Sequence, residues 1–361
     1  MRYIDEFRTS AIIRPLADAI RTGSKRPLSI MEICGGHTNT IIRYALADIL
    51  PPTITLVSGP GCPVCVTPIR YIDSAVEYAQ RPGVITVTFG DLIRLPGSVS
   101  TLMRERELGA DVRVSYSPAE ALVIAKENPE RTVLFLAIGF ETTTPLTAAL
   151  IDEAAEKKID NLVVLPSHRV MPPAMAALVA DGDIPIDAFI CPGHVSVITG
   201  AQIYEPVARE HKKICVVSGF EPADMLRSIL MIVRQAQRGE AAVEIEYTRA
   251  VTREGNRTAQ AMIQKIFAPI DGEWRGLGTL PESALGIRQE YERFDAEKRF
   301  GPVSTASREN PACVCADVLR AKKVPSDCPL YAKACTPEHP EGACMVSPEG
   351  SCNIFFRYGK R

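Results

Sequence analysis

Residues 27–50 read PLSIMEICGGHTNTIIRYALADIL, and this stretch indicates the fold. PLSIMEIC is a short apolar run typical of a buried strand, and it ends at Cys34. GGHTNT then suggests a loop, and TIIRYALADIL has the apolar spacing of a helix. A strand, a glycine-rich loop and a helix in this order place loop side chains at the carboxyl end of a parallel sheet.

The same alternation continues downstream, which is typical of a doubly wound α/β protein. There are too many units for one sheet of modest size, so we expect two Rossmann-like α/β lobes with parallel sheets, at 1–145 and 146–240. The remaining residues, 241–361, should hold an edge strand at VEIEYTRAV and a charged helix at ALGIRQEYERFDAEKRF. A small cysteine-rich module should follow from about residue 305. The predicted strands further include TITLV, VITVTF, RTVLFLAIG, NLVVLPSH, AFICPGH and ICVVSG.

Composition excludes several classes of function. The 361 residues are 46% apolar and 23% charged with a net charge of -2, so nucleic acid is not an expected partner. No long apolar run predicts a membrane span, and MRYIDEFRTS lacks the apolar core of a signal peptide, so we expect a cytoplasmic protein. A P-loop, a dinucleotide fingerprint and a G-x-S-x-G elbow are all absent from the sequence.

Six of the eleven cysteines lie in the tail between Cys313 and Cys352, CVCADVLRAKKVPSDCPLYAKACTPEHPEGACMVSPEGSC. Such a cluster in a cytoplasmic protein indicates a metal site rather than a disulfide framework. Thiolates with only His339 nearby favour an iron–sulfur cluster, with structural zinc as the alternative. A cubane needs four ligands, so two cysteines are left over. The tail is proline-rich, and we expect it to need its metal in order to fold.

A second group of thiols stands at strand ends in the first lobe. Cys62 and Cys65 have the C-x-x-C spacing, so their sulfurs can pair or share a metal. A helix beginning soon afterwards would favour the thiolate form. Cys34 and His37 add a soft ligand and a proton carrier on a neighbouring strand end. A simple redox disulfide or a zinc knuckle at Cys62 and Cys65 is the alternative.

Polar side chains follow other predicted strands, where α/β sheets build sites. A solvated turn, a helix cap or a core histidine is the structural alternative in each case. Cys191 and Cys215 lie inside apolar runs and are predicted to be buried and inert. The polar candidates are Asp91, Arg94 and Ser98 in GDLIRLPGS, Glu141, Thr142 and Thr143 in GFETTTP, and also His168 and His194.

Eight motifs occur in order from about residue 30 to the end of the chain. They are CGGHTNT, GPGCPVCV, GDLIRLPGS, GFETTTP, PPAM, PGHVSVITG, SGFEPADML and the cysteine pattern of the tail. Taken together, these motifs resemble the HypD family of hydrogenase maturation factors. One departure is Asn39, which stands where many members of the family carry a second histidine.

The resemblance implies a scaffold that builds the Fe(CN)2CO unit of [NiFe]-hydrogenases. Its implied partners are a small HypC-type chaperone that brings the iron and a HypE-type protein that supplies cyanide. Cys34 corresponds to the expected ligand of the transient iron with its CN and CO ligands, with His37 beside it. Cys62 and Cys65 correspond to the family's C-P-V-C pair, and which of them binds iron is left open.

The resemblance also divides the tail cysteines into two roles. The family's tail is similar to the cluster site of ferredoxin:thioredoxin reductase, where a dithiol lies beside a [4Fe-4S] cluster. Carried over, Cys315 and Cys344 are the dithiol. The implied cluster ligands are Cys313, Cys328, Cys335 and Cys352.

Three functions remain open at this point. The first is a metallocofactor-assembly factor with redox activity, because thiol–disulfide exchange moves two electrons at a time. The second is a thiol–disulfide oxidoreductase that uses an iron–sulfur cluster and a C-x-x-C pair on a client protein. The third is a zinc-stabilised binding module. Whether the chain is itself an enzyme is left open.

Overall fold

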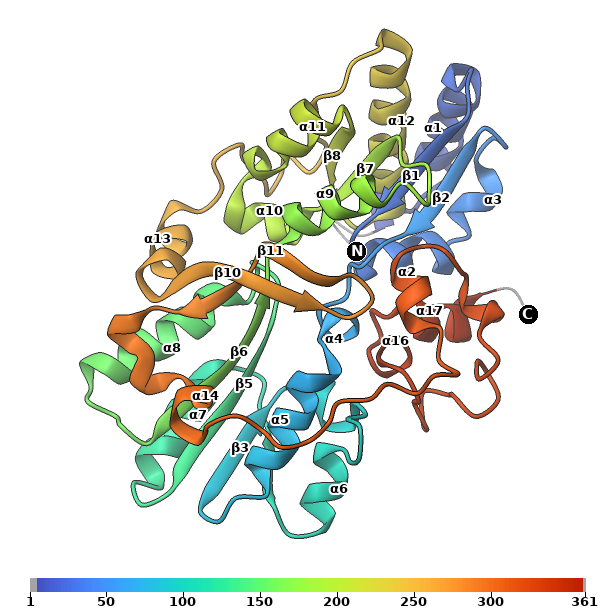
Figure 1. Ribbon diagram of the computed structural model, residues 1–361. Helices are drawn as coiled ribbons and strands as arrows, with labels where there is room; N and C mark the ends of the chain where they lie inside the picture. Colours follow the sequence, from blue (N-terminus) through green and yellow to red (C-terminus); the bar gives the residue numbers. More distant parts are fainter. Residues whose placement is uncertain (1–4, 360–361) are drawn as a thin grey trace.

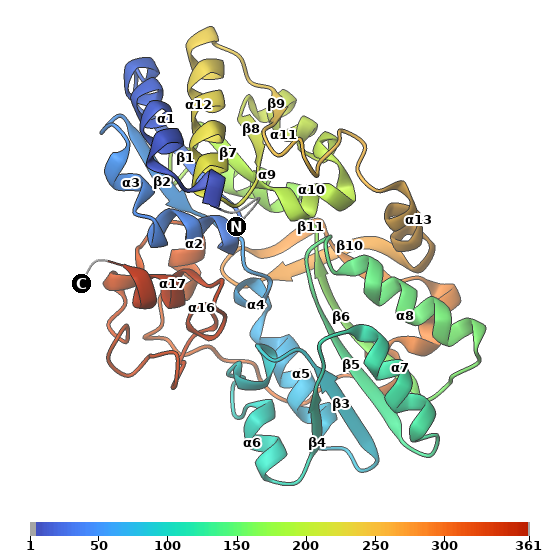
Figure 2. The same cartoon turned by 180° about the vertical axis from the view of Figure 1, so that it is seen from behind.

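Two α/β lobes and a C-terminal segment make up the computed structural model, which describes residues 5–359 (Figures 1 and 2). The first lobe is built on a five-stranded sheet in which every neighbouring pair is parallel. Its strands, in spatial order, are β2 (Ile54–Ser58), β1 (Leu28–Glu32), β7 (Ala188–Pro192), β8 (Ile214–Ser218) and β9 (Val243–Ile245). The short β9 is the predicted edge strand.

The second lobe is built on a six-stranded sheet that is mostly parallel. An antiparallel hairpin that the sequence pattern did not reveal, β10–β11, is added to one side of β6. The order is β10 (Phe267–Trp274), β11 (Gly278–Ile287), β6 (Leu162–Arg169), β5 (Thr132–Gly139), β3 (Val84–Thr88) and β4 (Asp111–Val114).

The sheets do not follow the predicted division of the chain at residue 145. Residues 1–145 contribute β1 and β2 to the first sheet and β3, β4 and β5 to the second. Residues 146–240 contribute β6 to the second sheet and β7 and β8 to the first. Periodicity locates strands along a chain, but strand pairing depends on long-range packing that periodicity does not encode. The chain therefore crosses between the lobes more than once.

Helices cover the faces of both sheets. Apolar side chains of α1 and α12 pack on the first sheet, and those of α7, α8 and α13 pack on the second. No helix within residues 5–359 is long and apolar enough to cross a bilayer. The helices used here are α1 (Ser10–Gly23), α2 (Gly35–Arg43), α3 (Leu46–Ile49), α4 (Pro63–Val66), α5 (Ile69–Ala79), α7 (Pro118–Glu127), α8 (Thr144–Glu156), α9 (Met171–Asp181), α10 (Gly193–Thr199), α12 (Pro222–Arg238), α13 (Arg257–Ile266), α14 (Ala296–Phe300), α15 (Cys315–Leu319), α16 (Ala343–Val346) and α17 (Ser351–Tyr358).

Two local predictions need correction. GGHTNT is not a loop, because it forms the first turns of α2 with Cys34 at the N-cap. Glycine disfavours helices, but a Cβ at Gly35 would lie 2.3 Å from the Glu349 carbonyl oxygen, so tertiary contact requires glycine there. The predicted helix ALGIRQEYERFDAEKRF instead begins as the end of β11 and continues as short 3-10 and α-helical turns.

The C-terminal segment packs on the lobes rather than standing apart. Figures 1 and 2 both show it beside α2 and α4, and α17 contacts α2 while α16 contacts α4. Ala343, Met345 and Val346 belong to the same apolar core as the α5 side of the second lobe. The segment therefore has a core in common with the lobes, which the low apolar content of the tail did not predict.

Candidate thiol and metal-binding site

Cys34 lies where β1 ends and α2 begins, and its side chain is buried. The Gly35 N–H donates to the Gly61 carbonyl at 3.2 Å, which joins the Cys34 turn to the turn before Cys62. A Cβ at Gly61 would lie 2.2 Å from the Cys34 nitrogen, so only glycine permits this approach. The two thiol motifs of the first lobe are therefore in direct backbone contact, as their positions on neighbouring strands predicted.

Two histidines flank Cys34. The Cys34 Sγ lies 3.8 Å from Nδ1 of His194, which is in the first turn of α10. His37 Nε2 is 3.0 Å from the Gly219 carbonyl oxygen, and Phe220 lies against both rings. Burial lowers the pKa of His37 to about 3 and that of His194 to about 4. Both imidazoles are therefore neutral near pH 7, because burial disfavours the protonated ring.

A buried carboxyl group lies beneath the Cys34 turn. The Cys34 N–H donates to Glu32 Oε2 at 3.0 Å, and the Thr38 hydroxyl donates to Oε1. Burial raises the pKa of Glu32 to about 8, against hydrogen bonds from Ser58 and Thr38. Burial also raises the pKa of Cys34, and the charge of Glu349 adds to that effect. Near pH 7 the site therefore holds a protonated Cys34 thiol above a largely protonated Glu32 carboxyl group.

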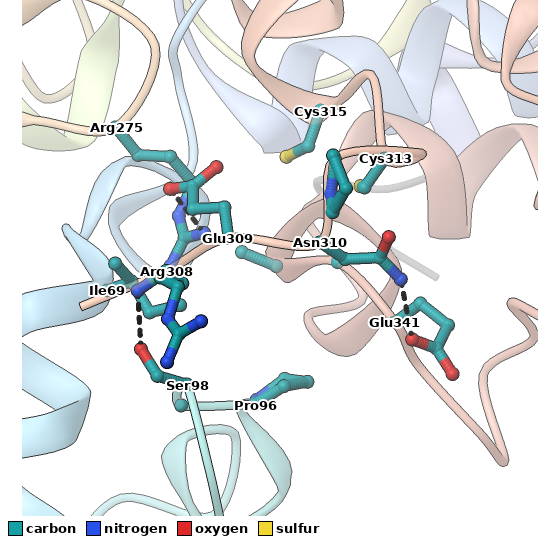
Figure 3. Close-up of a pocket in the computed structure, with 14 residues that line it drawn as sticks. Ile69, Pro96, Ser98, Arg275, Arg308, Glu309, Asn310, Cys313, Cys315 and Glu341 are labelled. Carbon is teal, nitrogen blue, oxygen red and sulfur yellow. Dashed lines mark hydrogen bonds and ion pairs between the residues drawn. The ribbon is translucent and has the colours of Figure 1, made fainter. Parts of the chain in front are cut away.

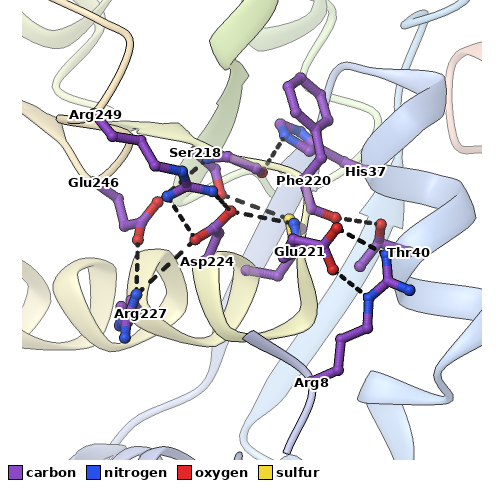
Figure 4. A network of polar contacts seen from close by, with 12 residues as sticks. Arg8, His37, Thr40, Ser218, Phe220, Glu221, Asp224, Arg227, Glu246 and Arg249 are labelled. Atoms are coloured by element: carbon purple, nitrogen blue, oxygen red, sulfur yellow. Dashed lines mark hydrogen bonds and ion pairs between the residues drawn. The ribbon is translucent and has the colours of Figure 1, made fainter. Parts of the chain in front are cut away.

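The loop at residues 218–221 that carries Phe220 is fixed by a network of ion pairs (Figure 4). Asp224 is fully buried and is held by Arg249, whose Nη1 lies 3.0 Å from Oδ1. Arg8 Nη2 donates to Glu221 at 2.8 Å, and the Thr40 hydroxyl donates to the Phe220 carbonyl at 2.6 Å. These contacts hold the loop against α2 and so fix the Phe220 ring that packs on both histidines.

Cys62 and Cys65 form a disulfide, and they belong to the short helix α4 with Cys62 at its N-cap. The helix predicted just after them, α5, begins separately at Ile69. Cys65 Sγ lies 3.9 Å from the carbonyl oxygen of Ala343, the residue before Cys344. The pair therefore lies between the Cys34 turn on one side and the tail on the other.

The six tail cysteines gather in one neighbourhood, and Cys315 Sγ lies 2.8 Å from Cys344 Sγ. The neighbouring Cys315 thiol raises the pKa of Cys313, and Cys315 and Cys352 raise that of Cys344. Burial raises the pKa of Cys335, and nearby Cys352 and Cys328 add to that effect. The six thiols are therefore near enough to influence one another electrostatically.

This donor set fits an iron–sulfur cluster in its chemistry. Six thiols in one neighbourhood supply the four thiolates that a cubane needs, together with two more. Within residues 5–359, however, no three His, Cys, Asp or Glu side chains are already arranged to hold a metal ion. The implied ligands Cys313, Cys328, Cys335 and Cys352 would each bind a different iron of a cubane, so they need not converge on a single point.

Residues of the GDLIRLPGS motif bind the tail to the second lobe. The sequence suggested either a functional site or a solvated turn for this motif, and neither includes this role. The Ser347 hydroxyl donates to Asp91 at 2.8 Å, and Arg94 donates to the Pro337 carbonyl at 2.9 Å. Ser98 Oγ accepts from the Arg308 N–H at 2.7 Å. These three candidates position the cysteines indirectly.

The remaining strand-end candidates lie in core environments. Glu141 is buried and accepts from the Met171 N–H at 2.9 Å, and burial raises its pKa to about 7. The Thr143 hydroxyl donates to main-chain carbonyls of the preceding turn. The hydroxyl of Thr142 is buried and has no hydrogen-bond partner among residues 5–359. His168 packs edge-on against Phe267 in the core of the second lobe.

The other two cysteines are core residues. Cys191 and Cys215 lie on the neighbouring strands β7 and β8 and are fully buried. Burial raises the pKa of Cys191 well above its usual range. Both residues are buried, as expected from the sequence.

Four residues near the thiols were not among the sequence candidates. Glu32 had a usable signal, because a carboxylate inside a buried strand is unusual. Phe220 and Glu349 lie in recognised motifs, SGFEP and SPEG, but their contacts depend on the folded chain. Arg275 lies in the unpredicted hairpin and contributes a positive charge near Cys315.

Comparison with known proteins agrees with the motifs. The family model described as "HypD: Hydrogenase formation hypA family" matches residues 11–359. The chain is 47% identical to the hydrogenase maturation factor HypD of Azotobacter vinelandii, covering 100% of this chain and 98% of the relative. It is 46% identical to HypD of Cupriavidus necator, with 100% and 98% covered. A putative hydrogenase expression/formation protein of Methanocaldococcus jannaschii is 44% identical, with 96% and 97% covered. The chain belongs to the HypD family of hydrogenase maturation factors.

Proposed function

We propose that the protein is a scaffold and redox protein for assembly of the Fe(CN)2CO unit of [NiFe]-hydrogenases. It works with a HypC-type chaperone that delivers iron and a HypE-type protein that supplies cyanide. The observation that carries the proposal is the succession of thiols through the molecule. Cys34 contacts the turn of the Cys62–Cys65 disulfide, and that disulfide contacts the tail beside Cys344.

Cys34 is the proposed ligand of the iron cargo. The thiol is buried and protonated, so it must lose a proton when it binds a metal ion. His194 Nδ1 lies 3.8 Å from the Cys34 Sγ, and burial keeps the imidazole neutral near pH 7. Its proposed role is to position the thiol, and to receive the thiol proton once metal binding has lowered the pKa of Cys34. Phe220 and buried Glu32 shape the rest of the site and keep it largely dry.

The Cys62–Cys65 disulfide is proposed to take up two electrons and two protons, and the resulting dithiol to release them, during ligand assembly. Cys315 and Cys344 are close enough to form the corresponding second pair. A [4Fe-4S] cluster on Cys313, Cys328, Cys335 and Cys352 would supply single electrons to that pair. The residues of the chain thus provide a path from the tail to the Cys34 turn.

Infrared spectroscopy of the protein purified anaerobically with its small partner tests the proposal. The proposal requires bands of iron-bound CN and CO, and these should disappear when the thiols are alkylated before the partner is added. A complex that contains iron but gives no such bands, with a cyanide donor present, would contradict it.

A thiol–disulfide oxidoreductase acting on a client protein is the second candidate function. The disulfide at Cys62 and Cys65, next to a thiol-rich tail, is the observation that favours it. This candidate predicts reduction of a client disulfide and no CN or CO bands. The same infrared experiment therefore separates the two functions.

A further inference from the structure

A cavity of about 550 Å³ opens beside the tail cysteines (Figure 3). Its walls come from the loop at 96–98, the extended segment at 308–313 and the tail at 341–343, together with Arg275. Cys315 lines this cavity, whereas its neighbour Cys344 does not. A ligand in the cavity would thus meet Cys315 before Cys344.

Arg275 gives the cavity an unused hydrogen-bond donor. Its side chain is 95% buried, its Nε donates to the Thr67 carbonyl at 3.0 Å, and its Nη1 pairs with Glu309 at 2.9 Å. Nη2 is buried with no hydrogen-bond partner among residues 5–359. A buried guanidinium nitrogen without a partner is costly, and a ligand oxygen would satisfy it.

The other charged groups of the cavity leave this donor available. Glu309 is engaged by Nη1 of Arg275, and Glu341 accepts from the Asn310 amide at 3.1 Å. Arg308, the second cation of the lining, is exposed at its mouth. An acceptor that carries negative charge is therefore the ligand chemistry that fits best, because hydrogen bonds between charged groups are the strong ones.

We propose that this cavity binds a small anionic thiol, which exchanges electrons with the protein at Cys315. The proposal rests on the proposed function. It names a two-electron reductant of the Cys315–Cys344 pair, in addition to the single electrons that the proposed cluster would supply. Cys315 is only 3% exposed, so a molecule must be small enough to enter the cavity to reach its sulfur. The carboxylate of the thiol would lie on Arg275 Nη2.

The exchange is balanced in atoms and electrons. When the pair is oxidised, the thiolate of the ligand attacks Cys315 Sγ, the Cys315–Cys344 bond breaks, and Cys344 leaves as a thiolate. A second ligand thiolate then attacks the mixed disulfide and releases Cys315. Two ligand thiols are oxidised to one disulfide, and the protein disulfide is reduced to two thiols, which take up the two protons.

The test uses the iron-loaded full chain with Cys344→Ser. This substitution removes the neighbouring thiol that would otherwise displace an adduct from Cys315. The probes are three symmetrical disulfides: dithiodiglycolate, which is anionic, bis(2-hydroxyethyl) disulfide, which is neutral, and cystamine, which is cationic. Intact mass and peptide mapping measure the rate and the position of the adduct. We expect the adduct on Cys315, formed about tenfold faster from the anionic probe than from the cationic one.

Arg275→Gln should reduce this preference to about twofold or less, and Arg275→Lys should retain part of it. Arg94→Gln is the matched control, since Arg94 also binds the tail but lies outside the cavity. Two results would overturn the proposal: an unchanged preference in Arg275→Gln, or adducts on cysteines other than Cys315.

Iron and sulfide are measured on the same samples, and the infrared bands are measured in parallel on the wild-type chain co-purified with the small partner and a cyanide donor. Missing CN and CO bands in that wild-type complex, together with the expected Cys315 preference in Cys344→Ser, would refute the proposed function and leave the binding site standing.

Discussion

Cys34 and the tail cysteines are held in different ways. Cys34 is fixed by a parallel sheet, by α2 and by glycines at Gly35 and Gly61, and all of these are features of the lobe fold. Residues 320–342 of the tail contain few buried side chains and have only short turns of regular structure. Residues 343–354 are instead largely buried against the lobes.

The proposed function turns this difference into a division of labour. The Cys34 site is preorganised and holds one thiol in a fixed position, as the proposed cargo role requires. The tail thiols are the proposed metal ligands, and part of the order of the tail would then depend on binding the metal. The following predictions test whether the two regions really differ in this way.

The largest effect is expected in the tail. Replacing Cys328 or Cys335 with Ala should abolish nearly all bound iron and sulfide, because a cubane that loses one thiolate is not stably held. Cys215→Ala is the control, since Cys215 is a core thiol, and it should retain both elements. Full iron and sulfide in either tail variant would refute the ligand set.

Removal of the cluster should loosen only part of the tail. Hydrogen exchange should become faster in residues 320–342, which have little apolar burial of their own. Residues 343–354 and the Cys34 turn should stay protected, because their core is shared with the lobes. Equal loss of protection across the whole tail would show that the metal holds all of it.

Cys315→Ser and Cys344→Ser should keep the cluster but slow reduction of the Cys62–Cys65 disulfide by more than about tenfold. The reason is the 2.8 Å contact of the two sulfurs and their position beside Ala343. Thiol counting after mixing with a reductant of low potential measures the rate. Loss of iron in Cys315→Ser, with iron retained in Cys313→Ala, would reverse the two roles.

Only part of this arrangement could be predicted from sequence. Strand and helix periodicity gave the α/β fold, and the spacing of cysteines gave the thiol groups. The interleaving of the lobes and the β10–β11 hairpin depend on strand pairing at long range, which local patterns do not contain. For the same reason, Arg275 was not a candidate, although its guanidinium lies close to Cys315.

The buried carboxyl group under Cys34 should give the lobe a pH dependence. Glu32 titrates at about 8 in the folded chain, whereas a model carboxyl group titrates at 4.5. The folded state therefore binds the proton more tightly, and its contribution is present below pH 4.5 and lost as the pH rises through 8. Glu32→Gln should remove this loss, which amounts to at most about 5 kcal/mol.

The measurement is the free energy of unfolding of the wild type and of Glu32→Gln between pH 5 and pH 9. The difference should grow with pH in favour of the variant. Glu141→Gln is a matched control in the second lobe, and its smaller effect should develop toward pH 7. A pH-independent difference for Glu32→Gln would mean that the carboxyl group is already ionised in the folded chain.

The smallest effect is expected where the tail is fastened to the second lobe. Ser347→Ala removes one hydrogen bond to Asp91, which should lower stability by about 1 kcal/mol. Asp91→Ala and the double variant complete a thermodynamic cycle measured by denaturant unfolding. A coupling energy near zero would show that this contact does not hold the tail.

The central claim is that Cys34 holds the iron cargo. The most direct test is infrared spectroscopy of Cys34→Ala co-purified with the small partner, with Cys191→Ala as the buried-thiol control. Our account predicts that Cys34→Ala folds and retains the tail cluster but gives no iron-bound CN or CO bands, while the control gives bands of wild-type intensity. Bands of wild-type intensity in Cys34→Ala would contradict the account and move the iron site to Cys62 or Cys65.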